Sequence, residues 1–241
     1  MKKFNLSALL ALAMALCMAF AGTAMAESAD AADTEFDPEA LINSLTGSYT
    51  ELFTTICAPE YDEVWLEKCK AAVGEENAEM VAEVLKSACT ATIYGPDAVE
   101  AYTADPDSAR FDCYFQGGVS TFVFEGNKLT GLDADGNEVF SHEYTYVEEI
   151  PDVIACHVYK TEDADAGEFT YLCLSDDSPA ETYHIEFRYG DDVEALSNYY
   201  DGKYAYWLAA GILSDADEEM IDNCIELFTV ENAGGDEEEA A

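Results

Sequence analysis

The chain has 241 residues, of which 49% are hydrophobic and 12% aromatic, and it carries a formal net charge of −41 at pH 7. The hydrophobic content is high enough to form a packed core, which excludes a fully disordered chain despite the charge. The strong negative charge excludes nucleic acid and anionic membrane surfaces as partners and favours cations.

The N-terminal residues have the pattern of a secretory signal peptide. Two lysines are followed by an apolar run over residues 6–21 and by the small-residue site Ala-Met-Ala, which ends at Ala26. We therefore predict a signal peptide over residues 1–26, a flexible acidic leader over 27–37 and an exported protein, either extracellular or periplasmic. No later apolar run reaches the ~20 residues of a membrane helix, so we expect no membrane insertion after signal removal.

The first part of the mature chain is predicted to be helical. An Asp-Pro start signal predicts a short helix over residues 38–45. Apolar residues spaced at three and four predict two further helices, over 60–74 and 76–89. The apolar spacing of residues 45–53 allows either a helix or a strand.

From residue 110 onward the sequence has the pattern of strands. Phe111, Cys113 and Phe115 are spaced at two, and turns rich in Gly, Asn and Asp separate the later alternating runs. The later strands are predicted over residues 120–125, 128–132, 138–147, 153–160, 169–174 and 182–189. Many short strands joined by such turns predict an antiparallel barrel or sandwich, so the expected fold class is mainly β (α+β) with flanking helices.

The C-terminal part returns to helical patterning. We predict a helix over residues 193–200, an aromatic segment over 204–210 and a last helix with Ser214 as its N-cap. Residues 231–241 are acidic and are predicted to form a disordered tail. The sequence between leader and tail, residues 38–230, is therefore expected to form one domain.

The hairpin predicted over residues 169–189 carries the best candidate for a binding site. Side chains at i and i+2 share one face of a strand, so His184 and Glu186 point the same way as Thr182. Asp177 lies in the loop that leads into this strand. Zinc binds imidazole nitrogen and carboxylate oxygen, so His184, Asp177 and Glu186 could supply three metal ligands. The alternative is that His184 lines the barrel without a ligand role.

The sequence carries no recognisable catalytic motif. It lacks the Gly-x-Ser-x-Gly of a hydrolase, a Gly-rich phosphate loop and a CxxC pair, and a Cys–His enzyme would have no local signature. The loop at residues 133–137 departs from EF-hand spacing and is predicted to be a hairpin turn. One of the eight cysteines lies in the signal peptide, which leaves an odd number whose pairing stays open. We therefore expect a binding protein rather than an enzyme.

Residues 165–177, with the sequence Asp-Ala-Gly-Glu-Phe-Thr-Tyr-Leu-Cys-Leu-Ser-Asp-Asp, resemble the strand that leads to the metal site in the ZinT family. This family includes the ZinT-like C-terminal domain of the AdcA zinc lipoproteins. The resemblance extends over residues 41–228, through segments that follow in the family's order: Leu45–Phe53, Tyr61–Trp65, Ser141–Tyr146 and Gly190–Tyr206. It implies a calycin (lipocalin-like) barrel with flanking helices, in an exported protein that binds zinc and helps deliver it to uptake systems.

The metal site of this chain departs from the family pattern of Ser-Asp-His, a loop and His-x-His. Asp177 stands at the first histidine, Thr182 at the second, and His184 matches the third. The resemblance implies that His184 and Asp177 bind the metal, and Glu186 on the same face could replace the missing donor. Oxygen donors weaken zinc binding and favour harder cations.

These observations lead to one expected function and one alternative. We predict an exported protein that binds a divalent metal ion, with zinc as the expected ion at low affinity, and that assists metal recruitment or buffering. A metal-uptake transporter component is a further expected partner. The alternative is a lipocalin-like module that has lost its metal site and holds a small apolar or cationic ligand, or a partner protein, in an aromatic-rich barrel.

Overall fold

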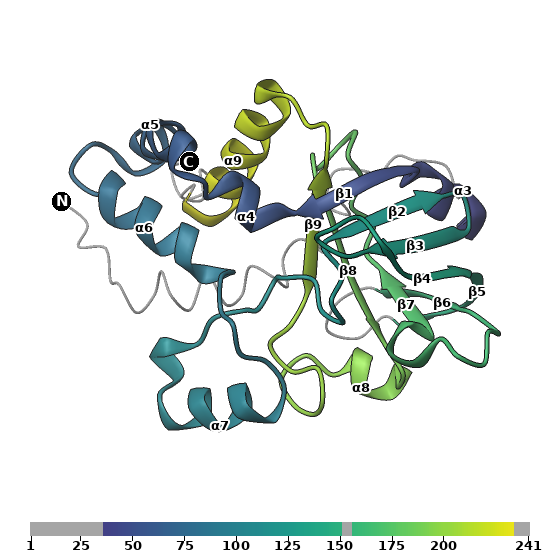
Figure 1. The fold of residues 1–241 in the computed structure, drawn as a ribbon. Coiled ribbons are helices and arrows are strands. Elements are labelled where there is room, and N and C mark those ends of the chain that lie inside the picture. The colour runs from purple at the N-terminus through teal and green to yellow at the C-terminus, as the bar shows by residue number, and fades with distance from the viewer. Residues whose placement is uncertain (1–35, 151–155, 234–241) are drawn as a thin grey trace.

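The computed structural model describes residues 36–150 and 156–233. The predicted signal peptide, most of the acidic leader and residues 234–241 of the predicted tail lie outside these ranges. Most of the helices gather on one side of a curled sheet, and one short helix lies at its other side, as Figure 1 shows. Within the described ranges, no helix is both long enough and apolar enough to cross a membrane.

Local sequence signals account for the helices that precede most of the sheet. These are α3 (Pro38–Ser44), α4 (Leu52–Ile56), α5 (Asp62–Val73), α6 (Ala78–Ala88) and α7 (Pro96–Ala104), with single 3-10 turns at Pro59–Tyr61 and Pro106–Ser108. Helix α3 begins after Asp37, whose side chain accepts hydrogen bonds from the backbone N–H groups of Glu39 and Ala40. The predicted helices over 60–74 and 76–89 are confirmed as α5 and α6.

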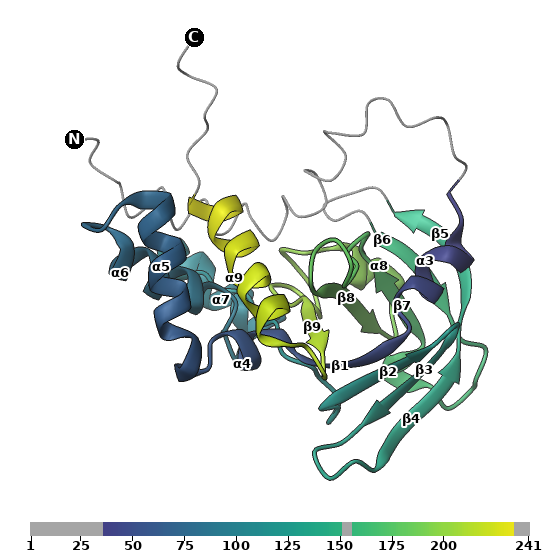
Figure 2. The ribbon, with the colours of Figure 1, turned by 90° about the horizontal axis from the view of Figure 1, so that it is seen from above.

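Nine antiparallel strands form one sheet in the order β4-β3-β2-β1-β9-β8-β7-β6-β5. Their bounds are β1 (Gly47–Glu51), β2 (Thr121–Glu125), β3 (Lys128–Leu132), β4 (Glu138–Glu143), β5 (Thr145–Ile150), β6 (Cys156–Lys160), β7 (Tyr171–Leu174), β8 (Ile185–Gly190) and β9 (Ala209–Leu213). The predicted strand over 138–147 is two strands, β4 and β5, which meet at Tyr144 and form the two edges of the sheet. The sheet curls strongly (Figure 2), and the expected mainly β, barrel-like fold with flanking helices is confirmed.

Aromatic side chains fill the space inside the curled sheet. Phe122 packs against Phe115, Phe140, Phe187 and Tyr189, with ring centroids 4.8–6.0 Å apart. These rings belong to one continuous buried cluster with the other inward-facing residues of the sheet. Aromatic side chains of the described residues therefore occupy much of the space that the alternative prediction assigned to a ligand.

A second core lies between the sheet and the helices α4, α5, α6 and α9 (Glu218–Ala233). Trp65 of α5 is buried in this core, and its indole N–H donates a hydrogen bond of 2.7 Å to the carbonyl of Ile56. Phe53 and Phe228 pack edge to face with ring centroids 5.3 Å apart, which holds α9 against α4. The two cores place α9 directly over the outer face of the sheet.

Residues 111–115 form no regular strand, in contrast to the prediction. Asp112 makes only isolated bridges, to Thr90 and Trp207. The apolar residues of this segment are buried because it passes between the two cores, with Phe111 in the helical core and Phe115 in the aromatic core. The spacing of apolar residues at every second position therefore reflects burial between the two cores, and it does not reflect pairing with a neighbouring strand.

Strand β9 lies at the centre of the sheet, although the sequence predicted only an aromatic segment over 204–210. Its small residues suit this crowded position. A Cβ atom at Gly211 would lie 3.2 Å from the Cβ of Tyr49 and 3.3 Å from the ring of Phe115. Close packing at this position requires small residues. Because Ala and Gly have low β-propensity, the sequence did not predict a strand here.

The last two helices are α8 (Val193–Ser197) and α9. Helix α8 is shorter than the predicted helix over 193–200. Helix α9 is capped by Asp217 rather than by Ser214, because the Asp217 carboxylate accepts a hydrogen bond of 2.9 Å from the backbone N–H of Met220. Helix α9 also includes residues 231–233, which were predicted to belong to the tail.

Candidate metal centre

The predicted hairpin is present as β7 and β8, which pair with Cys173 opposite Arg188. Strand β8 begins only at Ile185, because Tyr183 has a φ of +65° that breaks the extended backbone. Thr182 closes the loop before the strand, and its hydroxyl oxygen lies 2.9 Å from the carbonyls of Ser178 and His184. The Thr182 hydroxyl is therefore engaged with backbone carbonyls of the loop and of His184.

His184 is fully buried directly before β8 and lies against α9. Its Nδ1 atom lies 2.6 Å from the carbonyl of Thr182, so Nδ1 carries the proton and donates this hydrogen bond. The other ring nitrogen, Nε2, lies 3.9 Å from Oε1 of Glu186. Burial lowers the pKa of His184, while the charge of Asp177 opposes this shift. The ring is therefore a neutral imidazole with its acceptor nitrogen turned toward a carboxylate.

Asp177 and Glu186 are both buried, at 5% exposure each. Ser175 Oγ lies 2.5 Å from an oxygen of Asp177 and 2.7 Å from the backbone carbonyl of Glu186. Burial raises the pKa of Asp177. Burial also raises the pKa of Glu186 well above its usual value, and the negative charges of Asp177 and Glu231 raise it further. The carboxylates thus oppose one another's ionisation in a space that excludes water.

Helix α9 adds residues that the sequence interpretation missed. Cys224, Phe228 and Glu231 lie on one side of the helix, at spacings of four and three. The Cys224 sulfur lies 4.0 Å from His184 Nδ1, and the Phe228 ring centroid lies 5.2 Å from that of His184. Burial, followed by the charge of Asp177, raises the pKa of Glu231 to about 7. The only sequence signal for Glu231 was its position on a helix face that otherwise carries apolar residues.

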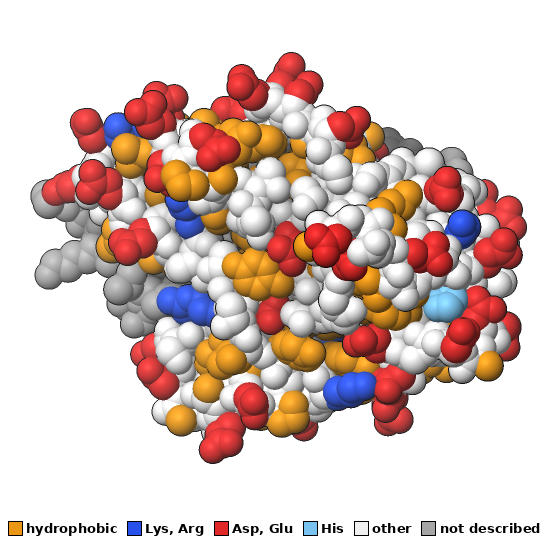
Figure 3. Space-filling model, in the orientation of Figure 1, with side chains coloured by type: hydrophobic (Ala, Val, Ile, Leu, Met, Phe, Trp, Pro, Cys, Tyr) orange, Lys and Arg blue, Asp and Glu red, His pale blue; other side chains and the backbone are white. Residues whose placement is uncertain are grey.

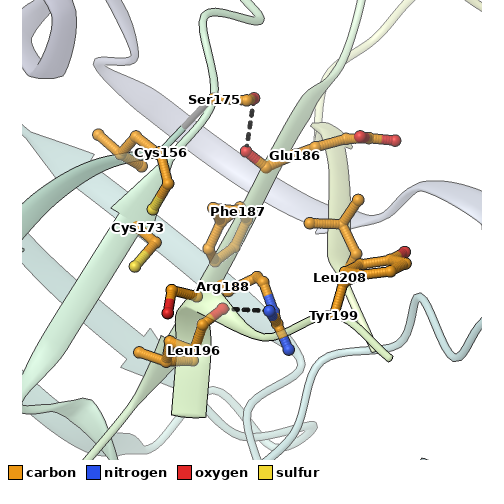
Figure 4. A pocket seen from close by; sticks show the side chains of 11 residues that line it. Cys156, Cys173, Ser175, Glu186, Phe187, Arg188, Leu196, Tyr199 and Leu208 are labelled. Carbon is orange, nitrogen blue, oxygen red and sulfur yellow. Dashed lines mark hydrogen bonds between the residues drawn. The ribbon is translucent and has the colours of Figure 1, made fainter. Parts of the chain in front are cut away.

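Figure 4 shows the neighbouring part of β8, beside a small cavity of about 20 Å³. The buried guanidinium of Arg188 donates hydrogen bonds to the carbonyls of Leu196 and Tyr204. The sulfurs of Cys156 and Cys173 line the same cavity. The guanidinium is thus held by backbone carbonyls, and the charges that act on Glu186 are those of other carboxylates.

The other two histidines are engaged elsewhere. His142 Nδ1 lies 2.8 Å from Asp163, and His157 Nε2 lies 3.0 Å from Asp176. Across residues 36–150 and 156–233, no three His, Cys, Asp or Glu side chains already stand in a metal-binding arrangement. The structure therefore brings His184 and Glu186 together, with Asp177 close enough to act on both, but the three do not form a ready-made coordination site.

Comparisons with known proteins give matches among solved structures only. No protein-family model and no curated protein matches the chain. The Zn(II)-bound ZinT-like domain of Streptococcus pneumoniae AdcA matches with a TM-score of 0.48 and 14% identity, over 79% of this chain and 94% of that domain. Zn(II)-bound AdcA from Streptococcus pneumoniae matches with a TM-score of 0.44 and 14% identity, over 81% of this chain and 39% of that protein. The first of these is the kind of domain that the sequence resembles.

Proposed function

We propose that this chain is an exported, non-catalytic protein that binds a divalent metal ion, with zinc as the expected ion, through His184, Asp177 and Glu186. The observation that supports the proposal most is the buried imidazole whose Nε2 faces Glu186 Oε1 at 3.9 Å. Two ligands of a tetrahedral zinc ion, each 2.0–2.1 Å from the metal, lie roughly 3.3 Å apart. Movement of about 0.6 Å would therefore bring these two atoms to ligand spacing.

Mutual repulsion among the carboxylates gives a reason for a cation to bind here. Asp177 and Glu231 both raise the pKa of Glu186, so the site resists ionisation while no positive ion is present. A divalent cation would offset these charges and would release the protons that the carboxyl groups hold. Asp177 would give up its contact with Ser175 or bind through its other oxygen.

The donor set also bears on affinity and selectivity. One imidazole nitrogen with carboxylate oxygens suits zinc, but it binds zinc less tightly than a set of three imidazoles. Acidic side chains spread over the molecular surface in Figure 3 and would concentrate cations near the protein. We propose that the protein buffers or recruits metal ions outside the cell membrane, where it could pass them to an uptake transporter.

Isothermal titration calorimetry with zinc chloride tests the proposal. Wild type should bind about one ion, and His184→Ala and Glu186→Gln should each bind at least about 10-fold more weakly. His142→Ala is the matched control, because His142 is also buried beside a carboxylate but lies at another part of the sheet. Near-UV circular dichroism would confirm that each variant is folded. Equal zinc affinity in wild type, His184→Ala and Glu186→Gln would refute the proposal.

A further inference from the structure

A surface groove of about 420 Å³ lies where the two edges of the curled sheet meet. It runs between helix α3, the turn from β2 to β3, and strands β5 and β6, and Figure 2 shows α3 beside β5. The groove is lined by Pro38, Glu39, Ile42, Asn43, Gly126, Asn127, Tyr144, Thr145, Tyr146 and Tyr159. Its volume lies within the ~300–1,000 Å³ that is usual for small-molecule sites.

The floor of this groove is aromatic and fixed in position. Tyr144 and Tyr159 are buried, and their hydroxyls donate hydrogen bonds to the carbonyls of Phe169 and Pro38. The half-buried ring of Tyr146 packs edge to face on Tyr159, with centroids 5.5 Å apart. Because Tyr144 and Tyr159 are only 2% and 1% exposed, Tyr146 is the ring of the three that a ligand can reach.

The charge that lines the groove is negative, while Lys128 and Lys160 follow the lining residues Asn127 and Tyr159 in the chain. Glu39 is the only charged residue among those that line it. Burial raises the pKa of Tyr146, and the charges of Glu149 and Glu148 raise it further. Asp37 at the start of α3 adds another carboxylate, which acts on Tyr159. A ligand in this groove therefore meets aromatic rings and negative charge together.

We propose that this groove binds a small organic cation, an ammonium or quaternary ammonium group on a compact apolar body. The cation would lie beside Glu39 and the Tyr146 ring, and its apolar part would fill the rest of the groove. Aromatic rings attract such cations through their negative faces, and the carboxylate adds to this attraction. None of His184, Asp177 and Glu186 lines the groove, so this site is independent of the proposed metal site.

Calorimetric titration with choline and with its neutral isostere 3,3-dimethylbutan-1-ol tests this proposal. At physiological salt, wild type should bind choline saturably and at least about 10-fold more tightly than the alcohol. Tyr146→Ala should weaken choline binding by about 10-fold, and Tyr146→Phe should retain it because the ring remains. Glu39→Gln should weaken choline binding without changing binding of the alcohol.

Tyr200→Ala is the control, because Tyr200 is an exposed tyrosine that does not line the groove. It should bind choline as wild type does. Absence of saturable choline binding by wild type, equal affinity for choline and the alcohol, or equal losses in Tyr146→Ala and Tyr200→Ala would each overturn the proposal. Zinc binding in the same samples reports on the metal proposal separately.

Discussion

Replacement of Glu231 by glutamine should remove a loss of stability that sets in as pH rises. The pKa of Glu231 is raised from 4.5 to about 7, first by burial and then by the charge of Asp177. The folded protein therefore keeps a proton that the unfolded chain releases above its own lower pKa. The contribution of protonated Glu231 to the free energy of unfolding is fully present below about pH 4.5 and is lost as the pH rises toward 7.

The size of the effect follows from the two pKa values. Their difference of about 2.5 corresponds to an upper bound of ~3.4 kcal/mol, since each pH unit is equivalent to ~1.4 kcal/mol. The Glu231 side chain is partly exposed, so solvent screening reduces the effect to about 1–2 kcal/mol. Glutamine cannot ionise, so Glu231→Gln should match wild type near pH 4 and exceed its stability by about 1–2 kcal/mol near pH 8.

Urea unfolding in metal-free buffer at about pH 4, 6 and 8, followed by tryptophan fluorescence, measures this difference. The matched control is Glu219→Gln, which changes an exposed glutamate on the same helix. The control should follow the pH dependence of wild type. If Glu231→Gln also loses stability in parallel with wild type between pH 4 and pH 8, the assignment of this loss to Glu231 is wrong.

Two further predictions concern the cores. Trp65→Phe removes the indole N–H that bonds to the Ile56 carbonyl at 2.7 Å, and the loss of this buried partner should cost about 1–3 kcal/mol in urea unfolding; an unchanged midpoint would show that the carbonyl finds another donor. Gly190→Ala would place a Cβ atom 2.5 Å from the ring of Tyr204, so overpacking should lower stability by about 1–3 kcal/mol in thermal unfolding. A Gly190→Ala variant as stable as wild type would show that Tyr204 can move aside.

The parts of the fold that follow local rules could be predicted from the sequence. Asp37 marked the start of α3 because its carboxylate satisfies backbone N–H groups that lie within three residues. His184 and Glu186 were placed on one face because alternation along a strand is itself local, and the structure sets their side chains 3.9 Å apart. These predictions needed no knowledge of what packs on the hairpin.

The parts that depend on tertiary packing could not be predicted in this way. Glu231 reaches the candidate site only because α9 lies across the outer face of the sheet. No local sequence pattern predicts which residues of α9 face that site. The alternating residues from Phe111 to Phe115 looked like a strand because burial between two cores produces the same period as a ladder. Strand β9 was missed for the opposite reason, because Gly211 serves close packing rather than β-propensity.

The pairing of β1 with β9 has a consequence for how the chain folds. Tyr49 lies opposite Leu213, so the two halves of the sheet are joined by partners 164 positions apart in the chain. Closing a loop of that length costs roughly 4–5 kcal/mol of chain entropy by the usual logarithmic scaling. Strands β2 to β4 and β5 to β8 can pair with their neighbours in the chain, but Tyr49 of β1 pairs with Phe122 of β2, 73 positions away, and the seam with β9 waits for nearly the whole chain. A chain still emerging from a ribosome can therefore hold separate parts of the sheet at most, and the continuous sheet is completed only after residues near 213 are free to return to the N-terminal strand.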